Sequence, residues 1–277
     1  MSSTSARYAS ILSPTPTIFL LALFCLFPGF SVSGATPDAR KIMADVYQQD
    51  SSHDATMRAT LEVFDKQGHG KKKRFTYRRI GSLGDSKTLV VFTDPEEIRG
   101  VALLSINRQG VSDRQFVYTP ATQRVRSIVA RERSERFIGS DFTFEDIAEH
   151  VLDDFTYRLL GSDETMDGHK TYKIEATPIA PEDSQYKFIY YWVAQDVPVV
   201  LHAEMYDATG REVRMLHASQ LKRVSGIWGA RRTEMTSVQD GTRTVLSIDE
   251  AKFNTGLDEK LFTPEGLEEG HPSVAGQ

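Results

Sequence analysis

The stretch of sequence that decides the fold is Tyr186-Lys-Phe-Ile-Tyr-Tyr-Trp-Val193. Its aromatic and β-branched residues favour a β-strand, in which successive side chains point to opposite faces. The even-numbered residues from Tyr186 to Trp192 would share one face, and the odd-numbered residues from Ile189 to Val193 the other. Since apolar groups occupy both faces, we predict a strand that is covered on both sides. From periodicity alone, the inner face can equally be the wall of an apolar cavity or a packed core.

Similar strands precede and follow this one. Residues 55–63 alternate with period two, and a turn signal at residues 65–70 leads into a return strand around Phe75 and Tyr77. Short turns containing Gly, Asp or Pro separate the segments, so we expect neighbouring strands to be antiparallel. About a dozen such strands curl into a barrel or a strongly bent sheet. Further strands are predicted near residues 88–93, 101–107, 114–119, 123–129, 155–160, 170–177, 186–194, 199–206, 212–224, 228–238 and 242–253.

Two segments have the period of amphipathic helices instead. Thr36-Pro37-Asp38 is typical of the N-cap, N1 and N2 positions of a helix that ends near Gln49. In the second segment, residues 140–152, Thr143 and Asp146 resemble a capping box. We predict that both helices cover the concave face of the sheet. Their apolar stripes are Ile42, Met43, Val46 and Tyr47 in the first, and Ile147, Ala148, Val151 and Leu152 in the second.

Residues 1–34 are interpreted as a secretory signal peptide. Arg7 precedes an apolar run over residues 18–27, which is too short to cross a ~30 Å hydrocarbon core. We expect cleavage near Gly34 or Ala35, which leaves residues 35–277 as a single domain whose last ~8 residues are disordered. The alternative is a lipoprotein acylated at Cys25, but the bulky Phe24 precedes that cysteine, where lipoprotein processing requires a small side chain.

The composition excludes several classes of function. The chain has 277 residues, a formal net charge of -5 and one Cys, so neither a strongly basic nucleic-acid-binding surface nor a disulfide is expected. No Gly-x-Ser-x-Gly motif is present. His202, Glu204 and His217 are the best candidate metal ligands, but a solvated strand face explains them more simply. We predict a protein without catalytic residues, metal or cofactor.

A basic run stands out in this acidic chain, at Lys71, Lys72, Lys73 and Arg74. It is either the solvated rim of a hairpin or a docking patch for anionic lipid headgroups or an acidic partner. The sequence leaves both interpretations open.

Several ordered motifs resemble those of a known family. Over about residues 35–267 the chain resembles the outer-membrane lipoprotein-sorting protein family of the LolA-like superfamily, in the branch often found with bacterial lipid exporters of the resistance-nodulation-division (RND) class. The motifs are Phe92-Thr-Asp-Pro95, Gly100-Val-Ala-Leu-Leu104, Phe116-Val-Tyr-Thr-Pro120, Arg124-Val-Arg126 and Phe137-Ile-Gly-Ser-Asp-Phe-Thr-Phe-Glu-Asp146.

The resemblance implies a periplasmic, incomplete antiparallel β-barrel whose apolar cavity, covered by helices, accepts acyl chains. It further implies carriage of a lipid or lipoprotein between membranes without covalent chemistry, transient contact with a membrane surface, and an inner-membrane RND-type transporter as a partner. The alternatives are a non-catalytic adaptor protein of such an exporter and a lipid hydrolase. We expect the cavity wall to contain Phe116, Tyr190, Trp192 and Trp228, and the lid helices to use Ile42, Met43, Val46, Tyr47, Phe142, Ile147 and Val151.

Overall fold

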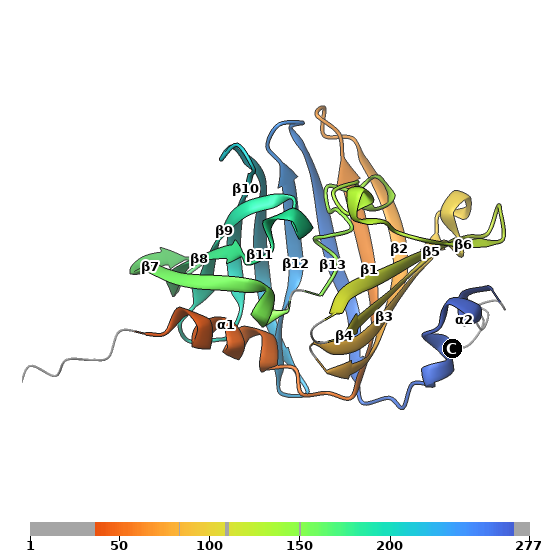
Figure 1. Ribbon diagram of the computed structural model, residues 1–277, viewed down its shortest axis with the longest axis horizontal. Helices are drawn as coiled ribbons and strands as arrows, with labels where there is room; N and C mark the ends of the chain where they lie inside the picture. The colour runs from red at the N-terminus through yellow and green to blue at the C-terminus, as the bar shows by residue number, and fades with distance from the viewer. Residues whose placement is uncertain (1–36, 83, 109–110, 150, 269–277) are drawn as a thin grey trace, which may run out of the picture. The chain divides into compact units, whose positions relative to one another are not determined.

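The computed structural model describes residues 37–82, 84–108, 111–149 and 151–268. The predicted signal peptide and the last residues of the chain lie outside these ranges. Within them, thirteen strands form one antiparallel sheet that bends around a concave face (Figure 1). The strands are β1 (Asp54–Phe64), β2 (Gly70–Ser82), β3 (Asp85–Asp94), β4 (Ala102–Arg108), β5 (Val111–Thr119), β6 (Arg124–Ser127), β7 (Phe155–Met166), β8 (His169–Pro178), β9 (Tyr186–Ala194), β10 (Val200–Asp207), β11 (Glu212–Val224), β12 (Ile227–Ser237) and β13 (Thr242–Phe253).

The strand order is β6-β5-β4-β3-β2-β1-β13-β12-β11-β10-β9-β8-β7. Consecutive strands pair with each other, except β6 and β7. The first strand, β1, pairs with the last, β13, so these two lie side by side in the middle of the sheet. Strands β6 and β7 form the two edges and are not paired with each other. The predicted incomplete antiparallel barrel is therefore confirmed, as a curved sheet that does not close.

Strand β9 has the predicted bounds and is covered on both faces. Ile189 and Val193 are 1% exposed on one face, and Trp192 is 4% exposed on the other. Tyr186 departs from the expected alternation, because the pairing of β9 with β10 shifts register beside it. Its ring joins the core of the concave face, and its hydroxyl donates a hydrogen bond to Asp146 at 2.6 Å.

Residues 128–149 and 151–154, here called the interior segment, follow the edge strand β6 and precede the edge strand β7, and they lie across the concave face. Phe137, Phe142 and Phe144 of this segment are buried against the inner face of the sheet. The Phe137 ring lies 5.6 Å from that of Phe92 and 5.7 Å from that of Phe144. The interior segment therefore supplies a large part of the core.

The predicted second helix is wrong. Thr143 and Asp146 do exchange the expected hydrogen bonds, with the Thr143 amide donating to Asp146 at 2.7 Å and the Asp146 amide donating to Thr143 at 3.2 Å. The chain nevertheless makes only a turn there. Glu145 instead accepts hydrogen bonds from the Ser184 hydroxyl and the Gln185 amide, so contacts with the chain before β9 replace the helix.

The predicted first helix is present as α1 (Ala39–Gln48) and covers the concave face near β8 and β9. Its N-cap is Asp38 rather than Thr36, because the Asp38 carboxylate accepts the Arg40 amide at 2.9 Å. Met43 is fully buried against Ile174 and Val193. Short 3-10 turns lie at Glu96–Ile98, Ala130–Glu132, Phe137–Gly139, Leu152–Asp154, Pro181–Asp183 and Glu259–Leu261.

A short C-terminal helix, α2 (Pro264–Glu268), lies beyond the sheet on the side of β4, β5 and β6 (Figure 1). Phe262 and Leu267 are fully buried there against Leu89, Leu104 and Phe116 on the outer face. Both faces of this part of the sheet are therefore covered. No helix among the described residues has both the length and the apolar character needed to cross a membrane.

Candidate functional site

An apolar cavity of about 380 Å³, here called the main cavity, lies between the sheet and the interior segment. A volume of this size falls within the usual range of about 300–1,000 Å³ for small-molecule sites. Strands β1 to β4 and β13 supply most of the wall, and the interior segment supplies the rest. The apolar wall residues are Met57, Ala59, Leu61, Phe75, Val90, Leu103, Phe137, Phe142, Ile147, Leu246 and Ile248.

One part of this wall is charged but internally paired. Arg79 of β2 is 8% exposed, and its Nη2 atom lies 2.9 Å from Oδ2 of Asp50 and 2.7 Å from Oγ of Ser52. Burial also raises the pKa of the neighbouring Tyr77 hydroxyl, which keeps it neutral. Since Asp50 follows α1, this ion pair fixes the end of the helix to the cavity wall.

A second hollow of about 230 Å³, here called the hairpin cavity, lies between the end of α1 and the β11–β12 hairpin. It shares Asp50, Met57 and Ile248 with the main cavity. The amide of Gln49 spans its rim, since Nε2 donates to the Pro198 carbonyl at 2.7 Å and Oε1 accepts from the Trp228 amide at 3.1 Å. The two cavities therefore adjoin at the shared Met57 and Ile248, on the inner face of β1 and β13.

Beneath α1 the concave face is filled rather than hollow. Tyr47, Tyr157 and Tyr191 pack together there, and burial raises the pKa of Tyr47 to about 12. Together with Met43, these rings hold α1 against β7, β8 and β9. This helix therefore borders only the hairpin cavity, through Val46 in its last turn.

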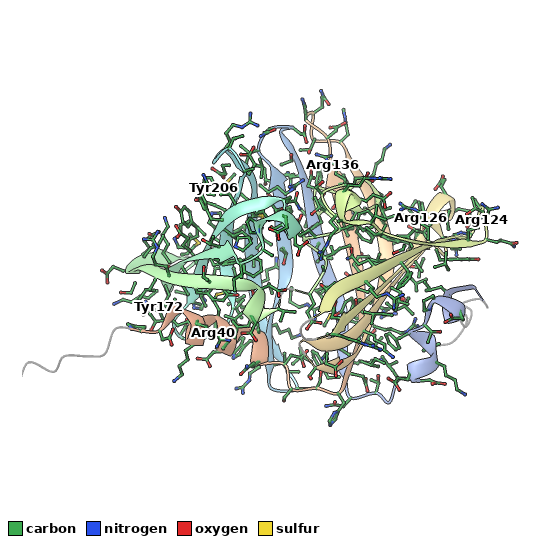
Figure 2. All side chains as sticks on the ribbon, in the orientation of Figure 1. Arg40, Arg124, Arg126, Arg136, Tyr172 and Tyr206 are labelled. Atoms are coloured by element: carbon green, nitrogen blue, oxygen red, sulfur yellow. The ribbon has the colours of Figure 1, made fainter. Side chains whose placement is uncertain are left out.

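None of the four residues predicted for the cavity wall lines the main cavity. Phe116 faces the C-terminal segment on the outer side of the sheet. Tyr190 packs with Phe188 and with Tyr206, which is labelled on β10 in Figure 2. Trp192 lies beneath the ammonium group of Lys173, 4.3 Å away. Period-two alternation predicts two faces but does not reveal which of them becomes concave, and here both are covered.

Trp228 was also predicted to line the cavity wall, but it packs mainly near the turn between β9 and β10. Its neighbours are Val197, Val199 and Leu201, and it contributes to the hairpin cavity instead. The residues that do form the main wall belong to ordinary alternating strands. The pairing of β1 with β13, which puts Leu61 opposite Leu246, brings them together, and no local sequence pattern indicates that pairing.

The expected lid residues of the interior segment separate into two groups. Phe142 and Ile147 line the main cavity, although from a turn rather than a helix. Val151 instead lines a polar hollow of about 330 Å³ beside Asp113 and Arg133. The Asp113 carboxylate lies 3.8 Å from the Arg133 guanidinium, yet burial raises its pKa to about 6.

The basic run at the start of β2 does not present four free charges. Lys72 lies 3.7 Å from Glu62, and Arg74 lies 3.2 Å from Asp94. Lys73 turns inward, where its ammonium group donates to the carbonyl of Ile138, and burial lowers its pKa. Lys71 remains exposed.

Two arginines of the family motif, Arg124 and Arg126, lie on the edge strand β6 (Figure 2). Arg126 pairs with Glu132 at 2.8 Å, and neither arginine lines the main cavity. They belong to the surface at the sheet edge.

The histidine pair lies on neighbouring strands. His202 and His217 are directly opposite each other in the register of β10 and β11, with ring centroids 6.5 Å apart. Each contacts a different carboxylate, Glu204 at 3.7 Å and Asp167 at 3.2 Å. In the part of the chain that the structure describes, no group of three or more metal-ligating side chains is placed to hold an ion, and no histidine lines the main or hairpin cavity.

Comparison with known proteins supports this fold. A protein-family model described as that of an uncharacterized protein matches residues 84–269. The match spans more than half of the chain, so the chain belongs to that family. No match to a curated protein was found.

The chain is similar to several solved structures, among them a lipoprotein-sorting domain, a DUF1329 family protein and a LolA superfamily protein. A domain from Vibrio parahaemolyticus, described as an outer-membrane lipoprotein-sorting protein, has a TM-score of 0.78 and 26% identity, covering 83% of this chain and 98% of that one. A DUF1329 family protein from Desulfovibrio piger has the same score and identity, covering 83% and 97%. A LolA superfamily protein from Nitrosomonas europaea shares the fold, with a TM-score of 0.67 and 20% identity over 82% of this chain and 98% of that one. The predicted resemblance to lipoprotein-sorting and LolA-like proteins is confirmed, whereas the branch associated with RND exporters stays a prediction.

Proposed function

We propose that this protein is a periplasmic carrier, which holds an acyl chain of a lipid or lipoprotein in the main cavity and moves it between membranes. The main cavity is the observation that carries the proposal, because it is lined mainly by apolar side chains and is partly covered by the interior segment. The similarity of the chain to a lipoprotein-sorting domain also supports the proposal. The signal peptide expected at residues 1–34 would bring the chain to the periplasm.

The energetics suit a carrier. Each buried methylene contributes about 0.8 kcal/mol, so an acyl chain of ~16 carbons supplies on the order of 10 kcal/mol before ordering costs. A bilayer gives the chain a similar free energy per methylene, so burial in the cavity offsets the cost of leaving the membrane. Release then requires a movement that opens the cavity. Phe142 and Ile147 lie on a turn, so displacement of this part of the interior segment would open the wall.

The proposed role needs no covalent step. The charged pair in the main wall, Arg79 and Asp50, is engaged in its own contacts and serves structure. We further propose that an inner-membrane RND-type transporter is the partner that loads or empties the carrier. Contact with the membrane itself would then be transient.

The proposal is tested by native mass spectrometry of protein purified from the periplasm, followed by uptake of a fluorescent fatty acid. Leu246 lines the main cavity and pairs with Leu61, whereas the next residue, Ser247, pairs with Thr60 on the outer face. We expect Leu246→Trp to fill the cavity and abolish uptake, and Ser247→Trp to leave uptake unchanged. Thermal unfolding of both variants verifies that each is folded.

The carrier proposal would be contradicted if the wild type showed a mass without bound lipid and took up no fluorescent fatty acid. An adaptor that binds an exporter through its surface would give the same two results. Co-purification of a membrane transporter with both Leu246→Trp and wild type, without any lipid, would favour that second role.

A further inference from the structure

The hairpin cavity extends the main cavity toward two cationic side chains. Met57 and Ile248 line both hollows, so the two adjoin there, and rotation of these two side chains would let an acyl chain in the main cavity reach the hairpin cavity. Lys222 of β11 and Arg231 of β12 also line the hairpin cavity. The apolar path therefore ends at positive charge.

This positive charge is not balanced within the wall. Asp50 is the carboxylate in the lining, and it is engaged by Arg79 at 2.9 Å and by the Ser52 hydroxyl at 2.6 Å. Lys222 makes no ion pair within the described ranges of the chain. Arg231 donates to the main-chain carbonyl of Asp249 at 2.6 Å, so a neutral group satisfies only part of its guanidinium.

We propose that the hairpin cavity binds the anionic oxygen headgroup of the carried lipid, a carboxylate or a phosphate, between Lys222 and Arg231. The inference rests on the proposed carrier function and specifies its ligand class. A guanidinium offers several donors in one plane to such oxygens, and an ammonium group adds a point charge. The acyl chain lies in the main cavity, and its charged end remains at the hairpin, where water is accessible.

The same hairpin offers a matched control. Lys222 pairs with Gly229 in the register of β11 and β12, whereas the next residue, Arg223, pairs with Trp228 and points to the other face. Arg223 donates to the Gly226 carbonyl at 2.9 Å, and Arg232 pairs with Glu234 at 3.1 Å. Replacing these two arginines removes the same charge from the same hairpin but leaves the cavity lining intact.

The test compares three ligands by competition with a fluorescent fatty acid at about pH 8, where carboxyl groups are ionised. Palmitate carries a carboxylate, palmitoyl lysophosphatidate a phosphate, and methyl palmitate no charge. We expect the wild type to prefer the anionic ligands, and the double variant Lys222→Gln/Arg231→Gln to lose about tenfold in affinity for them, as loss of about 1.4 kcal/mol implies. Methyl palmitate should bind both proteins equally. The control Arg223→Gln/Arg232→Gln should match the wild type for all ligands.

Each outcome is decisive. A larger loss with lysophosphatidate than with palmitate identifies phosphate as the preferred headgroup, and the reverse identifies carboxylate. Equal binding of all three ligands by the wild type overturns the headgroup site while leaving the carrier proposal in place. An equal loss of all three ligands in the double variant also overturns it, because the two cations would then only support the structure. Failure of the wild type to bind any of the three contradicts the carrier proposal itself.

Discussion

The Nη2 atom of Arg79 lies 2.9 Å from the Oδ2 atom of Asp50, at the junction of α1 with the cavity wall. The Arg79 side chain is 10% exposed and that of Asp50 is 28% exposed, so the pair is largely removed from water. A buried guanidinium whose carboxylate is lost keeps its desolvation cost without compensation. This contact therefore joins the N-terminal helix to the sheet at the point where the two cavities meet.

The first prediction concerns this ion pair. We expect Asp50→Asn to lower the free energy of unfolding by about 2 kcal/mol, less than for a fully buried pair because Asp50 retains some contact with water. Urea unfolding at neutral pH measures the change. Asp45→Asn is the matched control, since Asp45 is an exposed carboxylate on α1 and its loss should have little effect. Equal stability of the two variants would show that the pair contributes no more than a surface charge does.

The strands could be predicted because their signals are local. Alternating side chains and turn residues give the bounds of β9, β11 and β13 as the structure has them. The closing contact between β1 and β13 joins residues about 190 positions apart, and no local pattern specifies it. The turn at Thr143 shows the opposite case, in which a correct capping signal precedes no helix because Glu145 bonds to Ser184 and Gln185.

The second prediction uses the raised pKa of Asp113. Burial raises the pKa of this carboxyl to about 6, against about 3.9 in an unfolded chain. Between these values the folded protein holds a proton that the unfolded chain has lost, so stability from this group falls as the pH rises from about 4 to about 6. We expect the wild type to lose on the order of 2 kcal/mol relative to Asp113→Asn over that window.

Urea unfolding of both proteins at a series of pH values measures this difference. Asp163→Asn serves as the control, because Asp163 is exposed and its removal should leave the pH dependence of the wild type intact. If the curves of wild type and Asp113→Asn run parallel between pH ~4 and ~6, the Asp113 carboxyl titrates normally in the folded protein.

The cavity wall was harder to predict than the strands. Phe116 and Val117 are neighbours, and both are buried, yet Phe116 packs beneath the C-terminal segment while Val117 faces the interior core. The sequence analysis placed Phe116, which has the larger side chain, in the cavity wall. The choice between faces depends on the direction in which the whole sheet bends, which is set by non-local packing of the interior segment.

The third prediction concerns that segment. Phe137 is 3% exposed, packs against Phe92 and Phe144, and lines the main cavity. We expect Phe137→Ala to reduce the free energy of unfolding by about 3–4 kcal/mol, because the deletion both removes apolar burial and enlarges the cavity. Phe188→Ala, on the half-buried outer cluster, should cost less than half as much. Chemical denaturation measures both, and a similar loss in the two variants would mean that the interior segment is not part of the cooperative core.

The fourth prediction tests the basic run as a membrane contact. Because Lys73 bonds to the interior segment, only Lys71 and Lys72 are suited to charge reversal without disturbing the core. Each lysine near an anionic surface contributes about 1 kcal/mol, so Lys71→Glu/Lys72→Glu should reduce co-sedimentation with phosphatidylglycerol vesicles at least tenfold at low salt. Lys170→Glu/Lys187→Glu makes the same charge change at two other exposed lysines and should have a smaller effect.

These lysines lie at the end of β2 near its turn with β1, whereas the β11–β12 hairpin lies at the opposite end of the sheet. Fatty-acid affinity in solution should therefore be unchanged in Lys71→Glu/Lys72→Glu, which separates loss of docking from loss of the cavity. Undiminished co-sedimentation of this variant would identify the run as a solvated hairpin rim. Reduced co-sedimentation with anionic vesicles, but not with purely zwitterionic ones, would instead establish an electrostatic contact, since a surface without net charge offers these ammonium groups no attraction.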